Sequence, residues 1–242
     1  MSTSAVTPPM SVQRDFWDAW NRKYRVGGVD PFMDRQRDKA VEWALRLGNE
    51  KARILEVGCG TGWLGSALSQ FGDVTGIDLS EGAVEEGRAL HPEVAFHCGD
   101  FLSLPLVGQF DLILSADVIA HVADQQAFTA RVVELLRPGG TFLLMTQNPK
   151  VWRRKSSLAP RAEGQIRDWP SLTRIRALLR DRFRLVHVNS LVPGGDRGLL
   201  WWVENRWVRG GIGRLIGRDR WCGFLERALL GRELVVVALR MP

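Results

Sequence analysis

A glycine-rich turn near residue 60 has the residue types that a nucleotide-binding loop needs. Residues 54–62 read ILEVGCGTG, an apolar stretch that runs into glycine at 58, 60 and 62. Glycine permits a tight turn and lets the backbone approach a ligand that side chains would keep away. Asp78 follows about 20 residues after Gly58, where a carboxylate can accept hydrogen bonds from both hydroxyls of a ribose. These residues predict a site for a nucleotide-like cofactor.

The position of the glycines argues against a nicotinamide dinucleotide. The fingerprint GxGxxG, counted from Gly58, needs glycine at position 63, and Trp63 stands there. The three cysteines and four histidines of the chain show neither the spacing of a disulfide scaffold nor that of a metal site. We therefore expect no metal centre, and we expect a reducing, cytoplasmic setting.

The elements that must position these residues alternate between strands and helices. Apolar runs predict strands at 53–57, 74–77, 94–97, 110–115, 141–146, 183–192 and 233–240. Periodicity and capping residues predict helices within 12–47 and at 61–71, 80–90, 122–136 and 169–179. This order favours an α/β fold with a Rossmann-like, seven-stranded, mostly parallel sheet and helices on both faces. Between the fifth strand and the last of these helices, the polar segment 147–168 predicts a long loop near a site.

These motifs resemble those of the class I S-adenosylmethionine-dependent methyltransferases, and most of all the small-molecule branch that includes the quinone-biosynthesis methyltransferases. The resemblance covers about residues 40–150. It rests on EVGCGTG at 56–62, GDF at 99–101, SAD at 115–117 and LLRPGGTFLL at 135–144, in the family's order. The resemblance implies S-adenosylmethionine as the cofactor and an antiparallel last strand.

The resemblance also implies roles for individual residues in cofactor binding. Glu56 would lie near the methionine ammonium group, Asp78 would bind the ribose, and Asp100 would bond the adenine amino group. Leu79 and Phe101 would pack against the adenine. The remaining cofactor-binding positions are Gly58, Cys59, Gly60 and Gly62 in the first motif and Ala116 beside the methyl donor.

His121 is the candidate general base. It follows the fourth predicted strand, at the sheet edge where ligands of such folds bind, and histidine can take a proton from an acceptor near neutral pH. The alternative interpretation is a histidine that only bonds nearby backbone at a helix start. Quinone-type relatives often read Glu-x-x-Glu-His here. This chain has Asp117 and Ala120 instead, so one carboxylate is missing and we predict no metal.

The N-terminal part predicts two regions. Residues 1–11 are small and Pro-rich, which favours disorder, and residues 12–48 predict a helical lid ahead of a methyltransferase domain at 49–242. Aromatic residues at helical spacing favour either a lid or simple packing, and the spacing does not separate the two. Trp20, Tyr24 and Asn148 are the candidate substrate contacts. Asn148-Pro149 does not match the box of nucleic-acid amino-methyltransferases, because it follows the fifth strand and precedes Lys150.

Charge is distributed unevenly along the chain. Residues 1–149 hold 13 Lys/Arg and 19 Asp/Glu, whereas residues 150–242 hold 20 and 8. The basic part includes a helical insertion at 193–232 that is rich in Gly, Arg and Trp. Its stretch 199–230 favours a cover over the acceptor site, with a peripheral membrane contact or a homodimer surface as alternatives.

We predict methyl transfer from S-adenosylmethionine to oxygen or nitrogen of a small organic molecule, which is also the expected partner. The alternative is a lipid-linked or polyprenyl substrate at a membrane surface. An RNA substrate is a weaker alternative, because only the basic charge of the C-terminal third supports binding to nucleic acid.

Overall fold

The computed structural model describes residues 7–24, 31–48, 51–154, 158–194, 201, 214 and 217–242. Its centre is a seven-stranded sheet with the strand order β3-β2-β1-β4-β5-β7-β6. The strands are β1 (Ala52–Val57), β2 (Gly72–Asp78), β3 (Ala95–Cys98), β4 (Phe110–Ala116), β5 (Leu136–Gln147), β6 (Phe183–Pro193) and β7 (Gly231–Arg240).

Pairing within the sheet is parallel except around the last strand. β1 pairs with β2 and β4 in parallel, as do β2 with β3 and β4 with β5. β7 lies between β5 and β6 and is antiparallel to both. The predicted fold class, with its antiparallel last strand, is confirmed.

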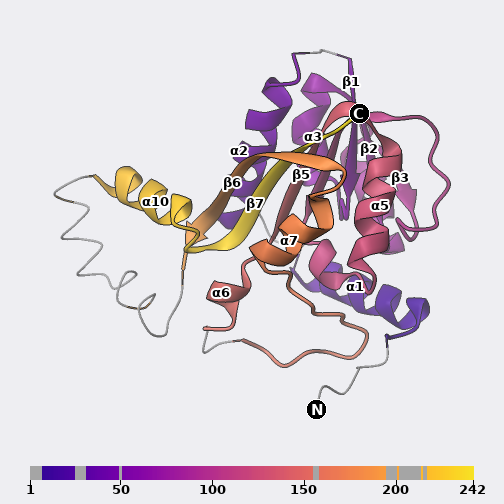
Figure 1. Cartoon of the computed structure of the whole chain (residues 1–242). Helices are drawn as coiled ribbons and strands as arrows, with labels where there is room; N and C mark the ends of the chain where they lie inside the picture. Colours follow the sequence, from indigo (N-terminus) through magenta and orange to yellow (C-terminus); the bar gives the residue numbers. More distant parts are fainter. Residues whose placement is uncertain are drawn as a thin grey trace.

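Helices surround the sheet (Figure 1). They are α1 (Met10–Tyr24), α2 (Pro31–Leu45), α3 (Trp63–Leu68), α4 (Glu81–Leu90), α5 (Gln125–Leu135), α6 (Pro149–Trp152), α7 (Leu172–Leu179) and α10 (Arg218–Arg227). Short 3-10 turns cover Ser69–Phe71 and Ile119–His121. α1 lies across one end of the sheet, and α10 projects from the body beside β6 (Figure 1).

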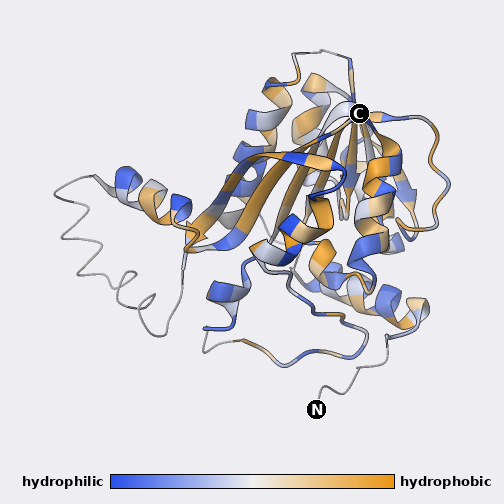
Figure 2. Cartoon of the chain, viewed as in Figure 1, coloured by the Kyte–Doolittle hydropathy of each residue, from blue (hydrophilic) through white to orange (hydrophobic). Residues whose placement is uncertain are grey.

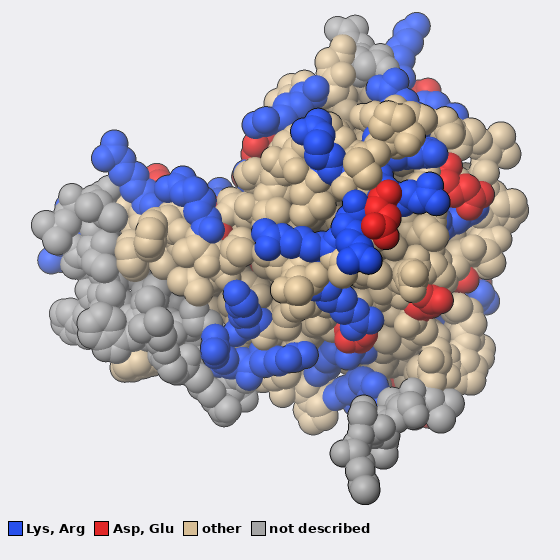
Figure 3. All heavy atoms as spheres, in the orientation of Figure 1, with Lys and Arg blue, Asp and Glu red and all other residues tan. Residues whose placement is uncertain are grey.

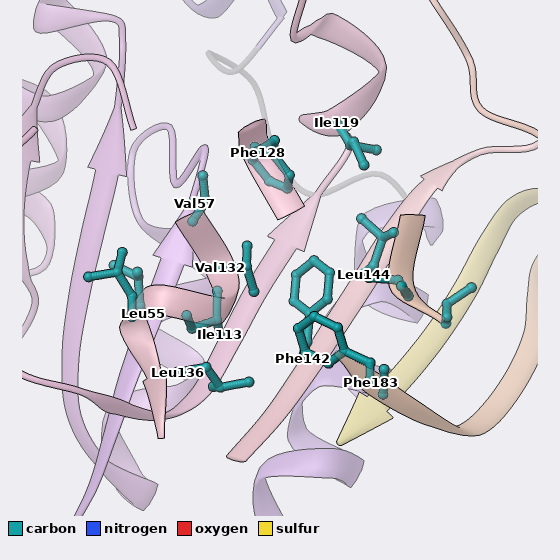
Figure 4. Close-up of a cluster of buried hydrophobic side chains, with 14 of the residues drawn as sticks. Leu55, Val57, Ile113, Ile119, Phe128, Val132, Leu136, Phe142, Leu144 and Phe183 are labelled. Carbon is teal, nitrogen blue, oxygen red and sulfur yellow. The ribbon is translucent and has the colours of Figure 1, made fainter. Parts of the chain in front are cut away.

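Both faces of the sheet are buried, because alternate residues of one strand point to opposite sides. Phe142 and Leu144 of β5 belong to a core cluster that includes residues of α5 and α7. Leu143 and Met145 belong to a second cluster with residues of α2, α3 and α4. Figure 2 shows the resulting apolar strands, and Figure 4 shows Phe142 packed among Phe183, Val132 and Leu144 in the first cluster.

Several element boundaries differ from the predicted ones. α1 begins at Met10, inside the segment expected to be disordered, and the Gln13 side-chain amide donates to the Pro8 carbonyl at 2.7 Å. Residues 1–6 lie outside the described part. α7 begins at Leu172 because Ser171 caps it, its hydroxyl accepting from the Arg174 N–H at 3.2 Å. Local capping interactions set these helix ends. Hydrophobic periodicity predicts such ends only to within a few residues.

Candidate cofactor and acceptor site

The glycine-rich turn binds the end of the neighbouring strand through its backbone. The N–H groups of Gly58 and Cys59 donate to the Ile77 carbonyl at 2.7 and 3.0 Å. Gly58 has φ +77°, and a Cβ on it would lie 2.2 Å from Val118 Cγ2. Only glycine fits both the left-handed conformation and the space at this position.

Asp78 is fixed at the end of β2 by backbone donors. Its Oδ2 accepts from the Gly60 N–H at 2.8 Å, and its Oδ1 accepts from the Ser80 N–H at 2.9 Å. The carboxylate therefore holds the turn in shape at the wall of the cavity.

A cavity of about 570 Å³ lies at the carboxyl ends of the parallel strands, where ligands of open α/β sheets bind. Its volume is within the roughly 300–1,000 Å³ typical of small-molecule sites. The described residues that line it come from the strand ends (Val57, Gly58, Gly60, Ile77, Asp78, Leu79, Gly99, Asp100, Phe101, Leu102, Ala116, Asp117, Gln147), from α1 and the residues before it (Thr7, Met10, Gln13, Trp17, Trp20, Asn21) and from 118–128 and 152–169 (Val118, His121, Val122, Ala123, Phe128, Trp152, Leu158, Ala159, Gln165, Arg167, Trp169).

Most of the predicted site residues meet in this cavity. Among them, Gly58, Gly60, Asp78, Leu79, Asp100, Phe101, Ala116, Trp20 and His121 line it. Glu56, Cys59, Gly62 and Asn148 do not. Tyr24 is the last residue of α1, and its side chain lies outside the described part.

Residues of the first motif that do not line the cavity pack behind it. Glu56 is buried, and a Cβ on Gly65 of α3 would lie 2.8 Å from its Oε2. Cys59 Sγ fills the space above Gly76, where a Cβ would come within 2.9 Å of it. Gly62 begins α3 with φ +81° against the Phe96 ring. These residues shape the turn from the inside of the fold.

Asn148 is part of the framework rather than of the cavity wall. Its Oδ1 accepts from the Lys150 N–H at 3.1 Å, which caps α6. Its amide donates to the carbonyls of Leu229 and Gly231 at 3.1 and 2.8 Å. The side-chain oxygen therefore caps α6, and the side-chain nitrogen joins the end of β5 to the start of β7.

His121 lies on the cavity wall with one ring nitrogen occupied. Its Nδ1 is 2.6 Å from the Ile166 carbonyl, which can only accept, so Nδ1 carries the proton and Nε2 is the acceptor of the neutral ring. The Trp17 ring of α1 packs edge-on against it, with centroids 4.8 Å apart. Desolvation lowers the pKa of the imidazole from 6.5 to about 4, against the opposing effect of the Ile166 bond and with a smaller contribution from the charge of Arg167.

α1 covers the cavity and is attached to α4. The Ser80 hydroxyl, which caps α4, donates to Asp18 Oδ1, and the Gly82 N–H reaches the same oxygen at 3.3 Å. On the other side of α1, a Cβ on Gly164 would lie 2.5 Å from the Val12 carbonyl oxygen. The helix is thus held between the start of α4 and the segment 158–169.

Two acids and an amide lie beneath the cavity. The Gln36 amide nitrogen of α2 donates to Asp117 Oδ2 at 3.1 Å and to Glu233 Oε1 at 2.6 Å. Burial, together with the nearby negative charge of Asp117, raises the pKa of the Glu233 carboxyl well above its usual value. Asp117 lines the cavity, whereas Glu233 is buried and does not. The pair is separated by over a hundred residues along the chain, and no local pattern marked Gln36 or Glu233.

The segment 147–168 was predicted as a loop near a site, but its individual contributions were not. Gln147, Trp152, Gln165 and Arg167 of this segment, and the adjoining Trp169, line the cavity. The stretch 199–230, expected to cover the acceptor site, lies partly outside the described residues, so that expectation stays a prediction.

The arrangement fits an S-adenosyl cofactor. The Asp78 carboxylate stands where ribose hydroxyls can donate, Leu79 and Phe101 give an apolar surface beside Asp100, and the backbone at Gly58 and Gly60 leaves room that a side chain would fill. Within the described ranges, no group of three or more His, Cys, Asp or Glu residues is placed to hold a metal ion.

Comparisons with known proteins find methyltransferases. Residues 54–140 match the family described as "Methyltransferase domain". The chain is 33% identical over 147 residues to the ubiquinone biosynthesis O-methyltransferase of Bordetella avium (strain 197N), covering 56% of this chain and 58% of that protein. It is 36% identical over 97 residues to a probable S-adenosylmethionine-dependent methyltransferase of Mycolicibacterium smegmatis (strain ATCC 700084 / mc(2)155), covering 39% and 38%. The matched region thus spans just over half of the first relative and less of the second.

Solved structures with this fold include N-methyltransferase NodS from Bradyrhizobium japonicum WM9 in complex with S-adenosyl-L-homocysteine. Its TM-score is 0.65 at 15% identity, with coverage of 93% of this chain and 98% of that one. Magnesium protoporphyrin IX methyltransferase (ChlM) from Synechocystis PCC 6803 with bound S-adenosylmethionine gives 0.63 at 19% identity, covering 99% and 100%. At these low sequence identities, the similarity shows a shared fold and nothing more.

Residues 54–140 thus carry a methyltransferase domain, and the strand order is that of the solved methyltransferase structures. These findings support the class I S-adenosylmethionine-dependent methyltransferases as the class that the sequence resembles, and S-adenosylmethionine as the cofactor.

Proposed function

We propose that the protein transfers the methyl group of S-adenosylmethionine to an oxygen or nitrogen of a small organic molecule. The observation that carries this proposal is the shape of the cavity. It extends from Asp78 and Leu79 to His121 and Trp169, and α1 and the segment 158–169 cover it. The space beyond the cofactor residues is that of a small acceptor. Small acceptors also appear in the names of similar proteins, ubiquinone and porphyrin methyltransferases among them.

The cofactor, when bound, supplies an activated methyl group on a positively charged sulfur, which an attacking oxygen or nitrogen displaces in line. The protein's part is to fix both reactants, and such alignment alone can account for about 7–11 kcal/mol of a barrier. Asp78 orients the ribose, Asp100 and Phe101 orient the adenine, and Ala116 leaves room beside the donor. The acceptor lies on the side of His121 and Trp169.

His121 suits a late proton transfer. Its Nε2 accepts a hydrogen bond from the attacking group, because the Ile166 bond holds the proton on Nδ1. A pKa of about 4 makes it a weak base toward a free hydroxyl. An oxygen that is gaining a methyl group becomes strongly acidic, however, and a weak base then suffices to receive its proton.

A specific observation favours a second candidate, a lipid-linked acceptor at a membrane surface. Trp221 and Phe224 of α10 stack with centroids 5.6 Å apart, Phe224 is 54% exposed, and Arg220 and Arg227 lie beside them. Trp221 is half-buried, so Phe224 is the exposed ring of the pair. An exposed aromatic ring with flanking arginines is typical of helices that lie on anionic bilayers. No helix in the described ranges is long and apolar enough to cross a bilayer.

Basic side chains also spread over the face formed by α7 and β6 (Figure 3). The exposed members of this group are Arg174, Arg176, Arg180, Arg182 and Arg184. Such a face attracts anions of many kinds. It supports a membrane or RNA partner only if the protein is found to bind lipid vesicles or RNA through these arginines.

The proposal is tested by following the label from tritiated S-adenosylmethionine. The protein is incubated with a cell extract that has been separated into small molecules, total lipid and total RNA. We expect label in the small-molecule fraction, and none when Asp78→Ala replaces the native protein. Label in the lipid fraction would select the second candidate. Label in RNA, or in no fraction although the cofactor binds, would refute the proposal.

A further inference from the structure

Arg167, in the acceptor half of the cavity, has no acidic partner in the part of the chain that the structure describes. Arg167 is the only Lys or Arg among the described lining residues. Its guanidinium donates to the carbonyls of Ala159 and Pro160 and to the Gln165 side-chain oxygen, at 2.8, 3.4 and 2.8 Å. All these acceptors are neutral. The neighbouring Asp168 pairs instead with Arg174, at 2.7 Å.

This guanidinium is partly desolvated. Desolvation by the surrounding protein lowers the pKa of Arg167, and repulsion from Arg161 adds to that effect. A cation that leaves water needs an anion to compensate it. Two of the five N–H groups of an arginine lie outside the three bonds described, so a ligand anion can still be bound.

The wall beside Arg167 is aromatic and rigid. The rings of Trp152 and Trp169 have centroids 5.9 Å apart at an interplanar angle of 38°, and the Arg167 guanidinium carbon lies 5.6 Å from the Trp169 ring centroid. The Trp152 Nε1–H donates to the Arg232 carbonyl at 2.9 Å, which fixes that ring and uses its only donor. Two adjacent indole rings favour a flat, conjugated ligand.

The reactive end lies close to this anion site. The carbonyl that His121 bonds belongs to Ile166, the residue directly before Arg167. The positive charge of Arg167 also lowers the pKa of His121, because it disfavours the imidazolium. A single small molecule can therefore reach both groups.

We propose that the methyl acceptor is an aromatic carboxylate bearing a hydroxyl or amino group, with its ring on Trp152 and Trp169 and its carboxylate on Arg167. The inference rests on the proposed function and narrows the substrate class. Arg167 is then the residue that determines specificity, and the acceptor's heteroatom is directed to His121 Nε2. Bound carboxylate also offsets the repulsion that Arg167 exerts on a protonated His121, so the acceptor itself makes the base stronger.

The test uses matched acids and amides with S-adenosyl-L-homocysteine bound to the full-length protein. The probes are 4-hydroxybenzoate with 4-hydroxybenzamide and 6-hydroxy-2-naphthoate with 6-hydroxy-2-naphthamide, followed by calorimetry. We expect at least one acid to bind about tenfold or more tightly than its amide, the gain of a charge-assisted hydrogen bond. Arg167→Gln should remove the preference, whereas Arg167→Lys should keep part of it. Arg174→Gln, in the same region but paired outward with Asp168, is the matched control.

A second measurement is the pKa of His121, followed by NMR. Binding of the acid should raise the pKa of His121, and binding of the amide should leave that pKa unchanged. If Arg167 only stabilised the loop, acid and amide would have the same effect. Equal binding of acid and amide, a preference that survives Arg167→Gln, or no binding of any probe at millimolar concentration would each overturn the inference. Binding of S-adenosyl-L-homocysteine is measured in the same experiment. If it binds and the acids do not, only the aromatic-carboxylate proposal fails; if it does not bind, the proposed function fails as well.

Discussion

Replacing Asp78 with alanine removes a carboxylate that serves the turn and the cofactor together. In the protein without ligand it accepts from the N–H groups of Gly60 and Ser80. With cofactor bound it should also accept from both ribose hydroxyls. A hydrogen bond to a charged group contributes about 1.5–3 kcal/mol, so two of them contribute about 3–6 kcal/mol. At about 1.4 kcal/mol per tenfold, affinity should fall roughly 10²- to 10⁴-fold.

The assay is calorimetry with S-adenosyl-L-homocysteine, together with thermal unfolding. Asp78→Ala also leaves two backbone N–H groups without their acceptor, and each kilocalorie per mole lost should lower Tm by roughly 2–4 °C in a chain of this size. Asp73→Ala changes an exposed carboxylate near the other end of the same strand and is the matched control. Affinity within about threefold of the native protein, at an unchanged Tm, would refute the reasoning that Asp78 binds the ribose.

Three further changes test the turn, the buried acid and the cover. Gly58→Ala should lower both Tm and cofactor affinity, because its Cβ would meet Val118 at 2.2 Å. Glu233→Gln should flatten the pH dependence of the free energy of unfolding in urea. The folded-state pKa of Glu233 is raised, so its contribution is present at low pH and is lost as pH rises through that pKa. Asp18→Ala should speed release of S-adenosyl-L-homocysteine in stopped-flow experiments, because α1 loses its bond to Ser80.

Each of these changes has a control. Gly139→Ala imposes nearly the same backbone strain as Gly58→Ala, with φ +76°, but its Cβ would meet no atom within 4 Å. Equal losses for both would show that strain and not the Val118 contact matters. Glu163→Gln is an exposed counterpart of Glu233→Gln, and a native-like slope in both variants would contradict a raised pKa for Glu233 in the folded protein. Asp15→Ala changes an exposed residue of α1, and equal release rates in the two aspartate variants would exclude an anchoring role for Asp18.

The sequence by itself determined the fold class, and the family that it resembles implied the cofactor. Gly58, Gly60 and Asp78 act through backbone conformation and strand ends, which are local properties that spacing records. The alternation of strands and helices likewise determined a parallel sheet, because a parallel connection needs a crossover element. His121 was placed at the cavity wall for the same reason, since it comes shortly after a strand that ends at this edge of the sheet; its role as a base stays a prediction.

Only the tertiary structure decided which side chains face the ligands. Glu56 and Cys59 flank lining residues in the sequence, yet strand pleat and turn geometry direct them into the core beside α3 and β2. Asn148 was drawn into the framework by carbonyls about 80 residues away. The acceptor wall of Trp152, Arg167 and Trp169, and the bond from Gln36 to Glu233 across 197 residues, carry no local pattern. Such contacts arise when separately folding segments pack together, and packing depends on the whole chain rather than on the spacing within any one segment.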